Sequence, residues 1–197
     1  METLIKLRSL QSAFTVAVML CCFAADVRAG TEIPRSADIS VLGMFLSDPE
    51  STRRVLEDPP EPLETGDDFP TVQICNSNNT ELLILVFHYG DVKDSFNEVR
   101  IRNISKPPTN CLEPPKQTNH FVTGKGIRLG ISKKELTIVF GPGFTENAEG
   151  SRIVIRYRID NFDKSNFLKK YNLPIYYGTY HFEKDKLIKF EFGFEYP

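Results

Sequence analysis

The chain has 197 residues, with 24 Lys and Arg against 26 Asp and Glu, and a formal net charge of −2. This length suits one or two domains with ordinary hydrophobic cores. The balanced charge argues against nucleic-acid binding through a basic surface. The sequence also lacks the run of roughly eighteen apolar residues that a membrane-spanning helix needs. We therefore expect a globular protein that neither spans a membrane nor binds nucleic acid.

The first 29 residues have the pattern of a secretory signal peptide. Two basic residues, Lys6 and Arg8, precede an almost wholly apolar stretch over residues 13–25. The stretch leads into Val27-Arg28-Ala29, which has the small residues that a signal peptidase accepts. We predict cleavage near Ala29 and a secreted or periplasmic chain; a buried N-terminal helix is the alternative interpretation.

The four cysteines divide between this stretch and the rest of the chain. Cys21 and Cys22 lack the preceding small residue of a lipid-modified cysteine, so we expect no lipid anchor. Removal of the signal peptide leaves Cys75 and Cys111, which have one possible intramolecular pairing in an exported chain. We predict this disulfide. The alternative is a reactive or metal-binding thiol pair, although no nearby histidine has the spacing of a zinc site.

The first half of the mature chain predicts one helix followed by antiparallel strands. Ser47 and Glu50 have the Ser-x-x-Glu spacing of a capping box, so we expect a helix over about residues 48–57. Strands are expected over about residues 71–75, 82–88 and 96–102. The second of these is a continuous apolar run and is therefore expected to be a central strand.

The second half repeats this order. Ser132 and Glu135 form a further Ser-x-x-Glu box ahead of a helix over about residues 133–140, which Gly141-Pro142-Gly143 ends. Strands are expected over about residues 152–159, 175–183 and 187–196. In the last strand, one face carries Phe190, Phe192, Phe194 and Tyr196, and the other carries Lys189, Glu191, Gly193 and Glu195. The aromatic face is the expected core.

The repeated order predicts an α+β fold of two tandem helix-plus-antiparallel-sheet modules, each α-β-β-β. The expected boundaries are 1–29 for the signal peptide, 30–104 for the first module, 105–118 for a proline-rich linker and 119–197 for the second module. Each module is small for an independent core. We therefore expect the two sheets to associate edge to edge. Two capping boxes that arose by chance are the alternative to a duplication.

A sequence motif in the second half carries a family resemblance. It reads Gly-Ile-x-Leu-Gly-x-Ser-x-x-Glu-Leu, then Phe-Gly-Pro, and consists of Gly126, Ile127, Leu129, Gly130, Ser132, Glu135, Leu136, Phe140, Gly141 and Pro142. Residues 119–197, and more loosely 38–104, thereby resemble the SmpA/BamE-like domain of outer-membrane lipoproteins. The tandem is similar in architecture to the β-lactamase inhibitor protein. The resemblance implies a concave sheet surface, and it makes an outer-membrane-associated lipoprotein of the envelope assembly type an alternative function.

No residue pattern marks a catalytic or metal site. The three histidines are His88, His120 and His181, and no Gly-x-Ser-x-Gly elbow accompanies them. Carboxylates and cysteines lack the spacing of calcium or zinc ligands. We therefore expect no enzyme activity, no metal and no cofactor. A small-molecule hydrolase that uses a histidine–carboxylate pair, such as His181 with Glu183, is the alternative.

The functional prediction concerns the sheet face opposite the aromatic core. Six side chains are expected there: Arg156, Arg158, Tyr177, His181, Glu191 and Glu195. Tyrosine and arginine commonly anchor protein interfaces. We therefore predict an exported, non-catalytic module that binds a protein partner through this open face. Cross-strand Arg–Glu pairing on a plain solvated face explains the same residues and is the alternative.

Overall fold

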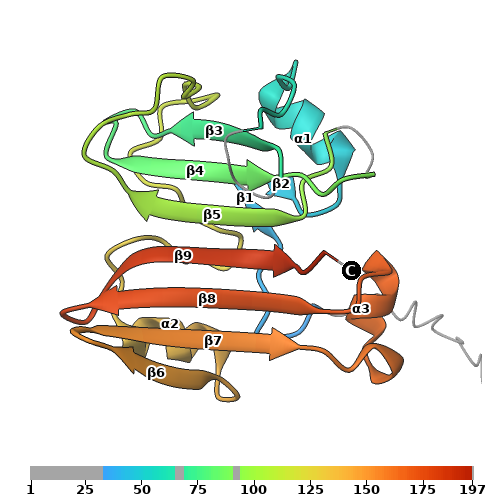
Figure 1. Cartoon of the computed structure of the whole chain (residues 1–197), viewed down its shortest axis with the longest axis vertical. Helices are drawn as coiled ribbons and strands as arrows, with labels where there is room; N and C mark the ends of the chain where they lie inside the picture. The colour runs from blue at the N-terminus through green and yellow to red at the C-terminus, as the bar shows by residue number, and fades with distance from the viewer. Residues whose placement is uncertain (1–32, 65–68, 91–93, 197) are drawn as a thin grey trace, which may run out of the picture. The chain divides into compact units, whose positions relative to one another are not determined.

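The computed structural model describes residues 33–64, 69–90 and 94–196 (Figure 1). The predicted signal peptide lies outside the described residues. From residue 33 onward the described chain belongs to one compact unit. None of the described helices has the length and apolar character that a membrane crossing requires.

The fold is α+β, as predicted, and contains one seven-stranded antiparallel sheet. Its strands are β3 (Thr71–Cys75), β4 (Glu81–Val86), β5 (Glu98–Asn103), β6 (Thr145–Glu149), β7 (Arg152–Ile159), β8 (Tyr176–Glu183) and β9 (Lys186–Phe194). Their spatial order is β3-β4-β5-β9-β8-β7-β6. The two halves meet where β5 pairs with β9, with Ile101 opposite Phe190. The last strand of each half thus joins the two halves into one sheet.

The two halves contain different elements. The first half adds a hairpin of β1 (Ser40–Val41) and β2 (Met44–Phe45) ahead of α1 (Pro49–Leu56). The second half begins with α2 (Lys133–Phe140). It inserts a short 3₁₀ turn (Phe162–Lys164) and α3 (Asn166–Tyr171) between β7 and β8. The simple order α-β-β-β therefore does not describe either half in full.

Helix α2 carries the predicted capping box. The Ser132 Oγ accepts a hydrogen bond from the Glu135 backbone N–H at 3.2 Å, and Glu135 Oε2 accepts one from the Ser132 N–H at 2.7 Å. These bonds satisfy backbone groups that the first helical turn leaves without partners.

Helix α1 is capped by a different residue from the one predicted. Asp48 accepts hydrogen bonds from the backbone N–H groups of Glu50 at 3.1 Å and Ser51 at 3.3 Å. The Ser47–Glu50 box was therefore a wrong prediction. Ser47 has a φ of 56°, outside the extended region that an N-cap needs, and its hydroxyl instead contacts Asn97. Pro49, whose ring fixes a helical φ, begins the helix.

One face of the sheet carries a single core that spans both halves. Phe190, Phe192 and Phe194 are buried on this face, as their alternation predicts. Helices α2 and α3 cover it with Leu136, Phe140, Phe167 and Leu168, and α2 lies behind β7 and β8 in Figure 1. Tyr196 does not join this core: it lies beyond the end of β9 and remains 48% exposed, because the alternation ends with the strand.

A second, smaller apolar cluster lies on the other face of β4. Its buried residues are Cys75, Leu82, Ile84 and Val86, and Phe69, Ile104 and Cys111 pack against them. Cys75 and Cys111 form a disulfide, with their Cα atoms 5.7 Å apart. The segment 105–118 is also hydrogen-bonded to β3, because the N–H of Cys75 donates to the carbonyl of Leu112 at 2.9 Å. This proline-rich segment is held against the sheet and is not a free spacer.

Candidate functional site

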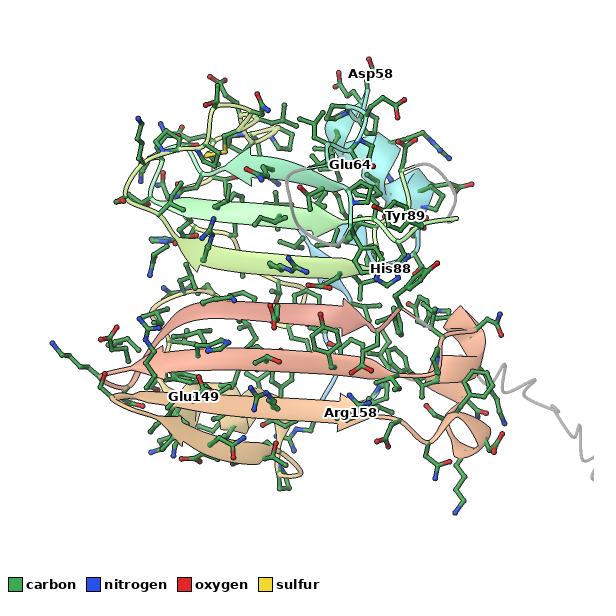
Figure 2. The ribbon with its side chains drawn as sticks, viewed as in Figure 1. Asp58, Glu64, His88, Tyr89, Glu149 and Arg158 are labelled. Atoms are coloured by element: carbon green, nitrogen blue, oxygen red, sulfur yellow. A yellow bond between two sulfur atoms is a disulfide. The ribbon has the colours of Figure 1, made fainter. Side chains whose placement is uncertain are left out.

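The face of β5, β9, β8, β7 and β6 that lies opposite the main core has no described chain segment in front of it (Figure 2). We call this surface the open face. Strand register and alternation give its side chains: Glu98, Arg100, Arg102, Lys189, Glu191, Tyr177, Thr179, His181, Glu183, Arg152, Val154, Arg156, Arg158, Thr145, Asn147 and Glu149. Glu195, just beyond β9, joins them through Arg158. This surface carries both acidic and basic side chains.

All six predicted interface residues lie on the open face, but around different hollows. Arg156, Arg158, Tyr177 and Glu195 line one hollow of about 460 Å³. His181 lines a second hollow of about 470 Å³ near the other end of the strands. Glu191 lies between them, with Arg100 on one side and Thr179 on the other. The structure therefore brings four of the six residues together.

Arg158 is held by two carboxylates. Its two terminal nitrogens face the Glu195 carboxylate, with Nη2 to Oε2 at 3.3 Å, and its Nε contacts Asp160 Oδ2 at 3.3 Å. The hydrogen bond to Glu195 is the main reason why the pKa of Arg158 is raised above its ordinary value. A guanidinium fixed in this two-pronged way presents a rigid, charged edge to a partner.

Tyr177 is half-buried, and the residue opposite it in β9 is Gly193, which has no side chain. Its hydroxyl donates a hydrogen bond to the carboxylate of Glu98. Burial is the main cause of a strongly raised pKa for Tyr177, and the charges of Glu98 and Glu191 add to it. The phenol therefore remains a neutral hydrogen-bond donor, and its ring is held in place.

Glu191 sits near the centre of the open face. Burial raises its pKa, and the nearby charge of Glu98 adds to this effect, whereas Lys189 lowers it. The Lys189 Nζ lies 3.9 Å from Glu191 Oε2, so the ion pair is loose. Arg156 has a similar loose pair with Glu149, with Nη2 to Oε1 at 3.6 Å. Such loosely paired side chains can exchange their partners on binding.

His181 lies on β8 between Lys189 of β9 and Val154 of β7. Its pKa is lowered, first by burial and then by the positive charge of Lys189. Glu183 lies two residues along the same strand face. In the described part of the chain, no hydrogen bond joins these two side chains, so the geometry gives the hydrolase alternative no assembled histidine–carboxylate pair.

Sequence reasoning did not find an aromatic cluster at one end of the sheet. Phe69 lies close to three rings, with centroid separations of 5.0 Å to His88, 5.6 Å to Tyr89 and 5.2 Å to Tyr196. Tyr89 is 52% exposed and Tyr196 48% exposed. The members come from segments far apart in the sequence, so no local spacing could have indicated them.

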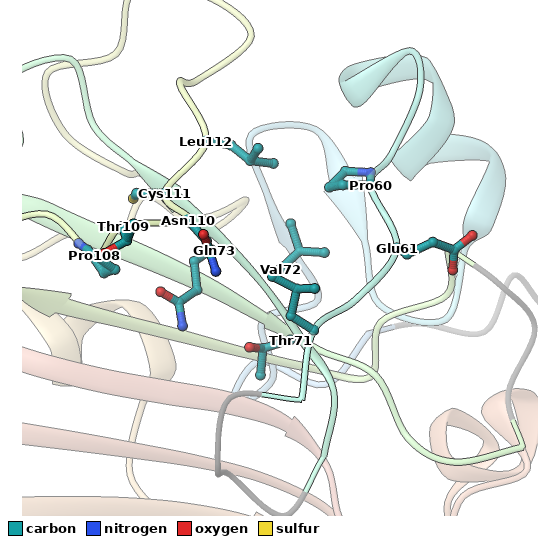
Figure 3. A pocket seen from close by; sticks show the side chains of 11 residues that line it. Pro60, Glu61, Thr71, Val72, Gln73, Pro108, Thr109, Asn110, Cys111 and Leu112 are labelled. Carbon is teal, nitrogen blue, oxygen red and sulfur yellow. The ribbon is translucent and has the colours of Figure 1, made fainter.

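A groove of about 590 Å³ lies along the outer edge of β3 (Figure 3). Pro60, Val72 and Leu112 are among its lining residues, and none of the six predicted interface residues contributes to it. Leu63 pairs with Thr71 at one end of β3, and Leu112 bonds to Gln73 and Cys75 at the other. The groove is thus the gap between two segments that protect an edge strand from further pairing.

Comparisons with protein-family models, curated proteins and solved structures found no match to this chain. The functional argument therefore depends on the residues and their geometry. Within the described ranges, no group of three or more His, Cys, Asp or Glu side chains is placed to hold a metal ion.

Proposed function

We propose that this protein is a non-catalytic interaction module that binds a protein partner through its open face. One observation carries the proposal. Helices cover one face of the sheet, whereas the face of β5, β9, β8 and β7 carries rigid tyrosine and arginine side chains with no described segment over them. Tyrosine and arginine are enriched among the residues that contribute most to protein–protein binding.

The way in which the polar and charged side chains of this face are paired also favours a protein partner. Arg158 and Tyr177 already have hydrogen-bond partners, so they lose little conformational freedom when a partner arrives. Lys189 and Arg156 are held only at 3.9 Å and 3.6 Å from their carboxylates. A mixed surface of this kind gives charge-based specificity around rigid anchors.

We further propose that the chain is exported, with the signal peptide removed near Ala29. The Cys75–Cys111 disulfide supports this proposal, because such bonds persist mainly in oxidising compartments. We also propose that the two halves descend from a tandem of SmpA/BamE-like modules. The antiparallel pairing of β5 with β9, the last strand of each half, supports a duplication.

The test is affinity capture of partners from the native compartment with two triple variants. The first, Arg156→Ala/Tyr177→Ala/Glu191→Ala, removes one arginine, one tyrosine and one glutamate from the open face. The matched control, Arg54→Ala/Tyr89→Ala/Glu57→Ala, removes the same residue types from exposed positions elsewhere. Thermal unfolding first establishes that both variants are folded.

We expect the open-face variant to bind the captured partner at least tenfold more weakly, about 1.4 kcal/mol, with the control close to wild type. Equal binding by the wild type and the open-face variant would contradict the proposal.

A further inference from the structure

The hollow beside His181 forms at an irregularity in the sheet. The pairing of β8 with β9 shifts between His181 and Phe182: His181 is opposite Lys189, but Phe182 is opposite Leu187. Ile188 is therefore an extra residue in β9, which makes a β-bulge. Bulges bend a strand and redirect its side chains, and they are frequent beside functional sites. The hollow of about 470 Å³ opens here, with Ile188 in its lining.

Basic side chains from four neighbouring positions line this hollow. Arg102, Lys189 and His181 follow one another in a row across β5, β9 and β8, and Arg152 reaches the hollow from β7. Among the described residues, neither Arg102 nor Arg152 has a carboxylate within 4.0 Å, and the contact of Lys189 with Glu191 is long, at 3.9 Å. In the other hollow, by contrast, Arg158 forms hydrogen bonds with the carboxylates of both Glu195 and Asp160.

The carboxylates at this hollow do not cancel its positive charge. Two of them, Glu149 and Glu183, are in the lining, against the three permanent cations Arg102, Arg152 and Lys189. Glu149 already contacts Arg156. Burial is the main cause of the lowered pKa of His181; Lys189 lowers it further, Glu149 raises it, and Arg156 and Arg152 lower it.

We propose that this hollow is the site on the open face where a carboxylate side chain of an acidic partner segment binds, between Arg102, Arg152 and Lys189. This inference rests on the proposed function, and it specifies one chemical group of the partner, a carboxylate. The lining has one more permanent cation than carboxylates, which matches a single negative charge. A dianionic phosphate would overcompensate this charge, so we infer a protein carboxylate as the occupant.

The experiment follows the His181 imidazole of the mature chain by NMR at low ionic strength. The probe is a hexaglutamate peptide, with hexaglutamine as the uncharged control and inorganic phosphate as a separate arm. We expect saturable shifts of the His181 signals with hexaglutamate only. The pKa of His181 should also rise when the peptide is bound, because a nearby anion favours the imidazolium.

A double variant tests which cations are responsible. Arg102→Gln/Arg152→Gln should weaken hexaglutamate binding at least fivefold. The control Arg54→Gln/Arg128→Gln, with the same change of charge at exposed positions elsewhere, should leave it within twofold. All four positions are exposed, so both variants are expected to fold, and thermal unfolding checks this.

Three results would overturn the proposal: hexaglutamate leaves His181 unperturbed, phosphate binds as tightly, or both variants lose affinity equally. These outcomes are distinct from a failure of the proposed function. If the captured partner binds Arg102→Gln/Arg152→Gln normally but not the open-face triple variant, the open face is the interface and the carboxylate site is wrong. If neither variant affects the partner, the open face itself is not the interface.

Discussion

The two halves of the sheet share one core but differ on the opposite face. In the first half, β4 is buried on both sides, toward the common core and toward the cluster of Cys75, Leu82, Ile84 and Val86. In the second half, β8 alternates between buried and half-buried side chains along most of its length. The difference follows from the chain connection: segment 105–118 returns over the first half and is fastened there by Cys111. The open face exists because no described segment does the same for the second half.

The largest effect on stability is expected from removal of the Cys75–Cys111 disulfide. The double variant Cys75→Ser/Cys111→Ser should lower the free energy of unfolding by about 3 to 4 kcal/mol, because the bond closes a long loop in the unfolded chain. Denaturant unfolding of the oxidised wild type and the variant measures this difference. A loss below about 1 kcal/mol would mean that hydrogen bonds such as Cys75–Leu112 hold the segment without the disulfide.

The next largest difference in stability is expected between substitutions at Ile84 and Arg156, which lie in one cross-strand row. Ile84 belongs to the covered half and Arg156 to the open half; the row runs through Arg100, Glu191 and Thr179. Ile84→Ala should cost about 2 to 3 kcal/mol, since it leaves a cavity in the second cluster. Arg156→Ala should change stability by less than about 0.5 kcal/mol. Similar losses in the free energy of unfolding from both substitutions would show that this face of the sheet is covered equally at β4 and at β7.

The junction between the halves depends on a glycine. A Cβ added to Gly193 would lie 2.3 Å from the carbonyl oxygen of Asn97 and 2.6 Å from the Cα of Glu98, so β5 would have to move. Gly193→Ala should therefore cost about 1 to 3 kcal/mol. Lys189→Ala, on the same face of the same strand but without this close approach, is the control and should be near neutral. Equal stabilities would mean that the junction tolerates a wider spacing.

Much of this fold could be predicted from periodicity. The span of α2 and that of β3 match the predicted ranges, and the alternation in β9 identifies Phe190, Phe192 and Phe194 as core. Strand β6 was not predicted, because all of its residues are exposed and it lacks an apolar alternation, and neither were the short strands β1 and β2. Helix α3, of six residues, begins with a Ser165 cap that lacks a glutamate partner and so also went unrecognised.

The site was predictable in part, for a physical reason. Alternation assigned side chains to the correct face, so all six predicted residues lie together on one surface. Alternation cannot show which charges are paired, since pairing depends on the order of strands in space. Cross-strand Arg–Glu pairing was one interpretation of this face, but the sequence did not indicate which arginines would pair. Arg158 pairs with Glu195, whereas Arg102 and Arg152 have no carboxylate within 4.0 Å among the residues that the structure describes. The bulge at Ile188, which lines the hollow beside His181, likewise depends on a pairing between β8 and β9 that no local pattern encodes.

The smallest predicted effect is on the pH dependence of stability and compares two residues of the open face, His181 and Glu191. The pKa of His181 is lowered in the folded protein from its ordinary value of 6.5. Below pH 6.5 the unfolded chain therefore binds more protons at this residue than the folded chain does, and stability falls as the pH decreases toward the folded pKa. The loss should be only a few tenths of a kcal/mol, because the side chain is partly exposed and solvent screens its neighbours. Glu191, whose pKa is raised, works in the opposite direction: it favours the folded state as the pH falls through its folded pKa toward 4.5.

Measuring unfolding from pH 7.5 to 5.0 for the wild type and His181→Gln separates the two contributions, since only the histidine differs. The wild type should lose more stability than the variant between pH 6.5 and 5.5. An identical slope would mean that neither burial nor the charges around His181 lower its pKa in the folded protein.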